Sequence, residues 1–313
     1  MLSLLGGIFM GWALGANDAS NVFGTAVGAR MVKFWTATFL ASVFVVLGAV
    51  ISGRAGIETL QGLTSFELSQ AVIASVAAAL SVSIMTLAGW PVSTSQAVIG
   101  AIIGIGIMNH QINLAGLGKV LACWFTTPLG GALISFTVYK VLAFFYNRLE
   151  ISLFTSDRLL KIGFVIFGSY GAYALGANNV ANVTAVFVGA GKLTVFQAAL
   201  IGGVSIALGI LTFSRHVMET VGQKLVELDP FSALMVSISL AITIHIYTII
   251  GVPVSSSQAI IGGLLGIGII KGTSTVSLKT LKGIFLAWFL TPVLACALAL
   301  FMVFVSFLEY VGP

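Results

Sequence analysis

Hydroxyl and amide side chains follow two prolines in otherwise apolar parts of the sequence. Pro91 is followed by Ser93, Thr94, Ser95 and Gln96, and Pro253 is followed by Ser255, Ser256, Ser257 and Gln258. Proline suits the first turn of a helix, and a helix N-terminus presents free N–H groups and the positive end of its dipole. Hydroxyls add donors for oxyanion oxygens. Each segment therefore predicts an anion site without a basic side chain. The alternative is that these serines only cap ordinary helices.

Carboxamides and one carboxylate form a second chemical set, also in two copies. Asn17, Asp18 and Asn21 lie within an apolar segment, and a second segment carries Asn178, Asn179 and Asn182. Asparagines four positions apart share a helical face. Their oxygens, together with main-chain carbonyls exposed by a helix break at the preceding Gly-Ala, are hard ligands suited to Na⁺. We therefore predict a cation site in each segment. The alternative is interhelical hydrogen bonding by buried asparagines.

Asp18 stands apart from the other acidic residues. It is the only one embedded deep within an apolar segment, where a carboxylate is costly and indicates function. It is also the best candidate to accept a proton from a protonated oxyanion. We therefore assign Asp18 to both the predicted anion site and the predicted cation site.

The composition of the chain excludes a water-soluble fold. Of 313 residues, 58% are apolar and 7% are charged, whereas soluble domains carry about 25% charged residues. Uncharged stretches such as Phe34–Ser52 are long enough to cross a bilayer. Soluble enzymes, nucleic-acid-binding proteins and secreted disulfide scaffolds are thereby excluded, and Cys123 and Cys296 are predicted to be packing residues. The sequence predicts an all-α polytopic membrane protein.

An internal repeat organises the chain. Four motifs return in the same order at an offset of 161 to 164 positions, among them Gly15–Val22 as Gly176–Val183 and Trp124–Pro128 as Trp288–Pro292. The repeat predicts two units, residues 1–150 and 158–313. In each unit we expect a helix broken at the Asn/Asp cluster, a plain span, a re-entrant hairpin at the Gly/Pro break, and a long final helix.

The repeat also predicts the topology. Each unit crosses the membrane an odd number of times, so the second unit is inverted relative to the first. Ten basic residues then fall on one side, and three fall on the other, namely Arg54, Lys119 and Lys192. Because cytoplasmic loops are enriched in Lys and Arg, both termini are predicted to face outward from the inner (plasma) membrane.

Two pairs of charged residues recur at equivalent positions. Arg54 with Glu58, and Arg215 with Glu219, are four residues apart. Such pairs are either interfacial ion pairs or gate contacts between moving parts. His245, which aligns with Ser83, is predicted to be a packed histidine rather than a proton relay.

Together these motifs resemble the inorganic phosphate transporter (PiT) family of sodium- or proton-coupled phosphate permeases. The family's G-A-N-D-x-x-N element stands as Gly15–Asn21 and again as Gly176–Asn182, and the hairpin tips and R-x-x-x-E-T contexts match as well. The resemblance covers essentially the whole chain. It implies inverted repeats, hairpin tips that bind phosphate, Asn/Asp elements that bind coupling ions, and a homodimer. One departure is Asn179, where the family commonly has Asp.

These observations predict a secondary symporter that imports inorganic phosphate with Na⁺. Its expected partners are phosphate, sodium ions and the lipid bilayer, with no cofactor and no nucleic acid. The same fold with H⁺ or with sulfate is the main alternative, and an anion channel is a remote one. A membrane hydrolase is disfavoured because neither motif holds a His or Lys to serve as its base.

Overall fold

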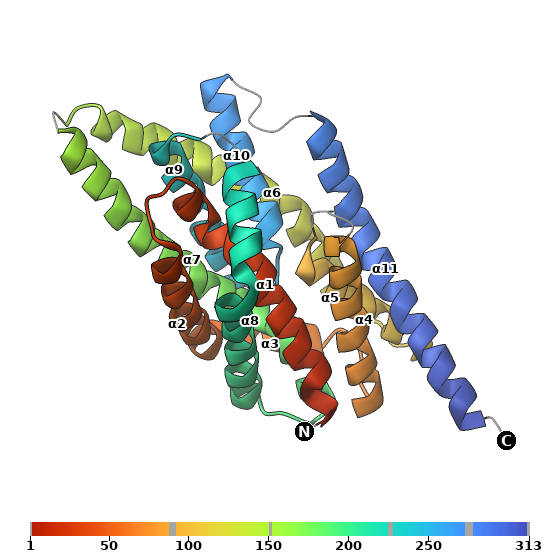
Figure 1. Ribbon diagram of the computed structural model, residues 1–313. Helices are drawn as coiled ribbons and strands as arrows, with labels where there is room; N and C mark the ends of the chain where they lie inside the picture. Colours follow the sequence, from red (N-terminus) through yellow and green to blue (C-terminus); the bar gives the residue numbers. More distant parts are fainter. Residues whose placement is uncertain (1, 88–91, 150–151, 225–227, 273–277, 312–313) are drawn as a thin grey trace.

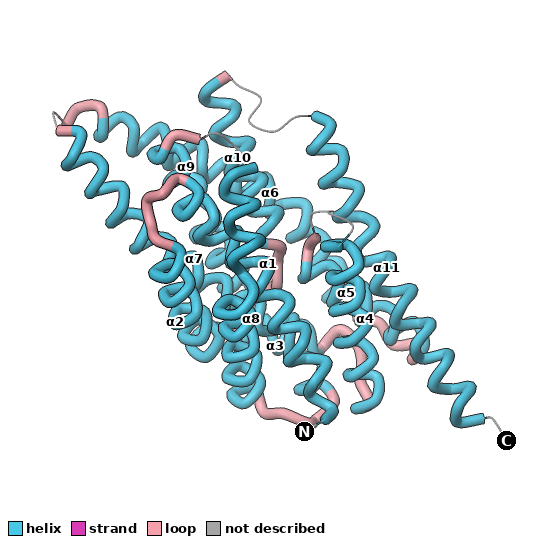
Figure 2. Tube along the Cα trace, in the orientation of Figure 1, coloured by secondary structure: helices cyan, strands magenta, loops and turns pink. Residues whose placement is uncertain are grey.

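The computed structural model describes residues 2–311, apart from residues 88–91, 150–151, 225–227 and 273–277. This part of the chain is helical and contains no strand (Figures 1 and 2). After the short 3₁₀ turn Leu2–Leu4, the helices are α1 (Leu5–Gly28), α2 (Phe34–Ser52), α3 (Arg54–Gln61), α4 (Leu68–Leu87), α5 (Thr94–Met108), α6 (Leu114–Tyr146), α7 (Leu153–Gly189), α8 (Val195–Lys224), α9 (Pro230–Ile250), α10 (Ser256–Lys271) and α11 (Leu278–Val311). Seven of the described helices are long and apolar enough to cross a membrane, which confirms the predicted polytopic membrane fold.

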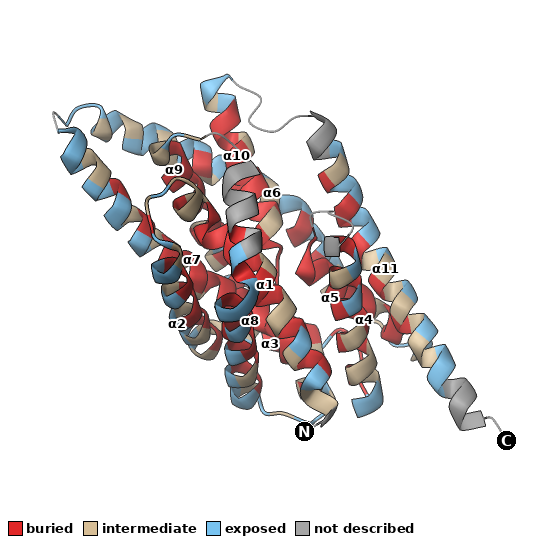
Figure 3. Ribbon diagram, viewed as in Figure 1, coloured by how far each residue is buried: buried red, intermediate tan, exposed pale blue. Residues whose placement is uncertain are grey.

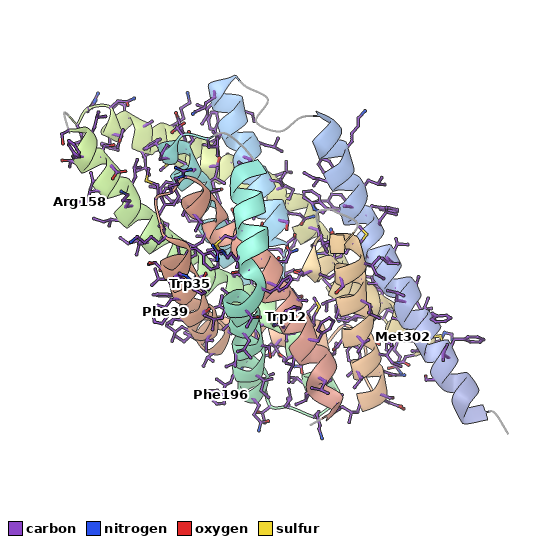
Figure 4. All side chains as sticks on the ribbon, viewed as in Figure 1. Trp12, Trp35, Phe39, Arg158, Phe196 and Met302 are labelled. Carbon is purple, nitrogen blue, oxygen red and sulfur yellow. The ribbon has the colours of Figure 1, made fainter. Side chains whose placement is uncertain are left out.

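The surface of the bundle is apolar, as expected for a protein surrounded by lipid. Buried residues gather between the helices and exposed ones lie on the outside (Figure 3). Large side chains such as Trp35, Phe39 and Phe196 project from the outside of the bundle (Figure 4). The long helices α6 and α11 are mostly exposed, with residues such as Phe125 and Phe289 on their open faces.

Two helical hairpins have the features of the predicted re-entrant segments. In each, a short helix packs back on the helix before it, α5 on α4 and α10 on α9. With 15 and 16 residues, α5 and α10 extend only about 23 Å, which is less than the hydrocarbon thickness of a bilayer. At the second turn Gly251 has a φ of 77°, a left-handed conformation that ends α9 and reverses the chain. The helices α5 and α10 therefore begin inside the bundle.

The two predicted units pack against each other through equivalent pairs of helices. Helix α1 packs on α8 while α7 packs on α2, and α5 packs on α11 while α10 packs on α6. Glycines at equivalent positions make the closest approaches: a Cβ added at Gly15 would lie 2.0 Å from the carbonyl oxygen of Ile206, and one at Gly176 would lie 2.0 Å from that of Val45. Such matched contacts are expected if the two units are related by a pseudo-two-fold axis. The unit boundaries and the inverted orientation remain predictions.

The predicted break at each Asn/Asp element is wrong. Helix α1 continues from Leu5 to Gly28 through the first element, and α7 continues from Leu153 to Gly189 through the second. The physical reason is that Gly15 and Gly176 allow the close helix packing described above, rather than interrupting the helix. Main-chain carbonyls of these elements are therefore used within the helices, and any ligand must be held by side chains.

Candidate functional site

The two hairpin tips, which are residues 92–96 and residues 252–258, touch each other inside the bundle. The Ser95 hydroxyl donates to the carbonyl oxygen of Val254 at 3.0 Å, and the Ser257 hydroxyl donates to that of Val92 at 3.2 Å. Side chains from α1 and α7 contact the two tips. Together with hydroxyls at the starts of α5 and α10 they form what we call the tip cluster: Asp18, Asn21, Thr94, Ser95, Asn178, Asn179, Asn182, Ser256 and Ser257. All of them are buried except Ser257, which is half-buried.

The carboxylate of Asp18 joins the two hairpins. Its Oδ2 accepts from Ser256 Oγ at 3.0 Å and from Thr94 Oγ1 at 3.4 Å, and the residue is only 1% exposed. One turn further along α1, Asn21 Nδ2 donates to Ser256 Oγ at 2.9 Å and to Ser257 Oγ at 3.3 Å. Residues predicted separately as an anion site and a cation site therefore belong to one constellation.

Side chains of helix α7 form hydrogen bonds with both tips. Asn182 Nδ2 donates to Ser95 Oγ at 2.9 Å and to Asn179 Oδ1 at 2.8 Å, and Ser95 Oγ lies 3.4 Å from the same Asn179 oxygen. Asn178 holds the backbone of the second tip, since its Oδ1 accepts from Val254 N–H at 2.8 Å and its Nδ2 donates to the carbonyl of Val252 at 3.1 Å. Asn178 is thus a positioning residue.

Among the described residues, four buried amide atoms of the predicted site residues have no hydrogen-bond partner. They are the acceptors Asn182 Oδ1, Gln96 Oε1 and Gln258 Oε1 and the donor Asn179 Nδ2. Nearly all buried polar groups in folded proteins are paired, so an unpartnered group indicates a ligand site. Amide oxygens suit a hard cation, and an amide NH₂ group suits an oxyanion.

The first serine of each tip caps its helix. Ser93 Oγ accepts from the N–H of Gln96 at 3.4 Å, and Ser255 Oγ accepts from the N–H of Gln258 at 3.3 Å. These two serines cap their helices, as the capping alternative expects, while the next residues of each tip enter the cluster. Asn17 is half-buried, and its main-chain oxygen accepts from Ser20.

The first predicted gate pair lies outside the tip cluster. Arg54 Nε is 2.6 Å from Glu58 Oε1, and their side chains are 78% and 45% exposed. Both line a cavity of about 300 Å³ together with His245 and Thr248, and Thr248 Oγ1 accepts from Asn178 Nδ2 at 3.3 Å.

The second pair and the histidine have other surroundings. The guanidinium of Arg215 lies 5.7 Å from the ring centre of Phe34, and the side chain of Glu219 is outside the described residues. The ring of His245 lies 5.4 Å from that of Tyr170 and 6.1 Å from that of Tyr173, which favours the packed interpretation.

Sequence reasoning missed the role of Lys119. From the start of α6, its ammonium donates to the carbonyl oxygen of Ile250, the last residue of α9, at 2.8 Å. A lysine there satisfies a free carbonyl and complements the negative end of the helix dipole. The equivalent position in the second unit is Gly283, which has no side chain to make the same contact. Because the acceptor is a main-chain atom, no side-chain motif could have indicated the contact.

Comparisons with known proteins match the chain over nearly its whole length. Residues 14–299 match the family model described as the phosphate transporter family. A protein of Methanocaldococcus jannaschii provisionally named a phosphate permease is 29% identical over 294 residues, covering 94% of this chain and 93% of the relative. The sulfate permease of Bacillus subtilis is 29% identical over 309 residues, covering 97% and 87%. A solved structure of the sodium-dependent phosphate transporter shares the fold with a TM-score of 0.87, at 24% identity and 98% coverage of both chains.

Proposed function

Because the chain belongs to the phosphate transporter family, we propose that it imports inorganic phosphate with Na⁺ across the inner (plasma) membrane as a secondary symporter. It is a multi-pass membrane transporter and not an enzyme. The observation that carries the proposal is the convergence of hydroxyls from both hairpin tips, Ser256 and Thr94, on the buried carboxylate of Asp18. The similarity to a structure of the sodium-dependent phosphate transporter supports the choice of coupling ion.

Charge balance explains why such a site needs a cation. Phosphate carries one to two negative charges near neutral pH, and the tip cluster contains a carboxylate but no Lys or Arg. An uncompensated charge in a water-poor interior is costly. Cations beside the oxyanion would supply the balance and couple the two gradients. The unpartnered oxygens of Asn182, Gln96 and Gln258 are suitable ligands for them.

Alternating access would follow from separation of the two tips. Ser95 and Ser257 each bond the backbone of the opposite hairpin, so opening the site on either side must break one or both contacts. In this mechanism the Arg54–Glu58 pair, and by equivalence Arg215 with Glu219, act as gate contacts. The homodimer that the family resemblance implies is part of the same proposal.

Uptake of labelled phosphate into proteoliposomes tests the function. The full chain is reconstituted, and initial rates are measured with and without an inward Na⁺ gradient at fixed pH, with sulfate as competitor. We expect saturable phosphate uptake that requires Na⁺. Uptake that ignores Na⁺ but follows a pH gradient would replace Na⁺ by H⁺, and non-saturating flux would indicate a channel.

Sulfate is the second candidate substrate. It is favoured by the similarity to the sulfate permease of Bacillus subtilis over nearly the whole chain. Sulfate and phosphate have similar size and shape, and they differ mainly in whether the oxyanion carries a proton to donate. Sulfate flux without phosphate uptake in the same assay would retain the transport site and change its substrate.

A further inference from the structure

The two units place different chemical groups at one equivalent position of the tip cluster. Asp18 in α1 corresponds to Asn179 in α7, and both are buried, with 1% and 0% of their surface exposed. The tip cluster therefore has one carboxylate where an unbroken repeat would have two. Its single titratable group is Asp18, and the amide of Asn179 is neutral at all relevant pH values.

Hydrogen bonds fix the orientation of the Asn179 amide. Its oxygen accepts from Asn182 Nδ2 at 2.8 Å and lies 3.4 Å from Ser95 Oγ, so the oxygen is the end that faces these neighbours. The Nδ2 group therefore points away from them, and it is buried without a partner. A carboxylate at this position would be an acceptor only, whereas the amide provides two N–H donors.

The consequence concerns the charge of the transported anion. A second carboxylate would repel a dianion, and it would favour an oxyanion that still carries a proton to donate. With an amide instead, the repulsion is absent and the anion gains a donor. The carboxylate of Asp18 already accepts from both tips, through Ser256 and Thr94, so its oxygens are partly satisfied. The unpartnered Nδ2 of Asn179 is then the donor left for an anion.

We propose that Asn179 is a specificity-determining residue that donates to the bound oxyanion and adapts the site to doubly charged tetrahedral anions, namely monohydrogen phosphate and sulfate. The inference rests on the proposed function, because it assigns a property of the same transport site. It names the form of the substrate and predicts that sulfate competes with phosphate.

The test compares Asn179→Asp with the wild-type chain in proteoliposomes under a fixed inward Na⁺ gradient. Initial rates of labelled phosphate and labelled sulfate uptake are measured across a pH series through the second pKa of phosphate. Sulfate does not titrate in this range, so its pH profile reports on the protein alone, including Asp18. The matched control is Asn113→Asp, the same chemical change at the N-cap of α6, where Asp is an equally good cap.

In the wild type we expect phosphate uptake to rise with pH relative to sulfate uptake, as the dianion becomes the main species. In Asn179→Asp we expect the sulfate-to-phosphate ratio of kcat/KM to fall at least tenfold, and phosphate uptake to shift toward lower pH. Asn113→Asp should match the wild type. A wild type that prefers the monoanion, or an active Asn179→Asp with unchanged ratio and pH profile, would overturn the inference while leaving the symporter intact.

A second variant covers the case in which Asn179→Asp does not fold. Asn179→Ala removes the donors without adding charge, and it should raise the KM for sulfate about tenfold, as expected for a lost hydrogen bond to a charged acceptor. An unchanged KM for sulfate would overturn the inference. A wild-type chain that moves neither anion would instead overturn the proposed function itself.

Discussion

Asp18 and the hydroxyls that bind it should contribute differently to transport. The carboxylate supplies the only full charge in the tip cluster, so Asp18→Asn should weaken the dependence on Na⁺ more than it weakens phosphate binding. The hydroxyls of Thr94 and Ser256 supply donors, so Thr94→Ala and Ser256→Ala should chiefly raise the KM for phosphate. A hydrogen bond to a charged group contributes about 1.5–3 kcal/mol, so each alanine variant should raise KM by about tenfold or more.

Kinetics in proteoliposomes distinguish these roles. Phosphate KM and the half-saturating Na⁺ concentration are measured for all three variants and the wild type. The division of roles is contradicted if both parameters change to the same extent in every variant. Ser83→Ala provides a control, because Ser83 donates to a carbonyl within its own helix, Ala79 O at 2.8 Å.

At the level of single residues, the sequence predicted the types of group better than their geometry. Thr94, Ser256, Asn21 and Asn182 all lie in the tip cluster. They could be predicted from the sequence because each motif occurs in two matched copies. The capping role of Ser93 could not be separated from ligand binding, since both use a hydroxyl directly before a helix. The unpartnered Nδ2 of Asn179 depends on which end of the amide its neighbours occupy, and spacing carries no information on that.

Helix packing through glycine gives a prediction at the scale of elements. In Gly176→Ala the new Cβ would lie 2.0 Å from the carbonyl oxygen of Val45 in α2, so α7 and α2 must move apart. Overpacking of this kind costs about 1–3 kcal/mol. Gly118→Ala is the matched control, since Gly118 lies in α6 with nothing within 4 Å of an added Cβ. Thermal unfolding in detergent should show Gly176→Ala less stable than the wild type.

Gly118→Ala should be neutral or stabilising by about 0.5–1 kcal/mol, because alanine is the better helix former. Equal stability of the two variants would show that the contact between α7 and α2 is not tight. The same glycines explain why the helix breaks predicted at the Asn/Asp elements were wrong. A glycine within an apolar run can indicate either a break or a close approach, and only the position of a distant segment, here α2 or α8, decides between them.

An ion pair joins the start of α9 to the end of α10, at the end of the second hairpin that lies away from its tip. Asp229 caps α9 by accepting from the N–H of Ser232 at 2.9 Å, and Lys271 at the end of α10 donates to the same carboxylate. Burial alone would raise the pKa of Asp229, but the hydrogen bonds from Lys271 and Ser232 outweigh burial and lower the pKa below its ordinary value. A lowered pKa means that the contribution to stability is present above about pH 4 and is lost as the pH falls through the native value.

The variant Asp229→Asn isolates this charge, because Asn caps a helix as well as Asp does. Its thermal stability in detergent should lie a few degrees at most below that of the wild type at pH 7, since the pair is half-exposed and screened by solvent. The difference should shrink as the pH falls below about 4. A difference that stays constant down to low pH would show that packing rather than charge is responsible.

At the scale of the whole molecule, equivalent loops of the two units allow a direct test of the predicted inversion. Lys33 and Lys192 lie in equivalent loops, after α1 and after α7, and both are exposed. If the second unit is inverted, these loops lie on opposite faces of the membrane, with Lys33 cytoplasmic and Lys192 outside. Helix α1 begins and α11 ends at the same end of the bundle, at the lower edge of Figure 1, which agrees with both termini lying on one side.

The measurement is labelling of single cysteines by a membrane-impermeant maleimide in intact cells. Cys123 and Cys296 are first replaced by alanine, a mild change because both lie within apolar helices and neither forms a disulfide. We expect Lys192→Cys to be labelled in intact cells and Lys33→Cys only after permeabilisation. Labelling of both from outside would mean that the units are parallel. Both hairpins would then enter from the same face of the membrane. The contacts of Thr94 and Ser256 with Asp18 would have to be made by two tips from that one face, rather than by tips that approach from opposite faces.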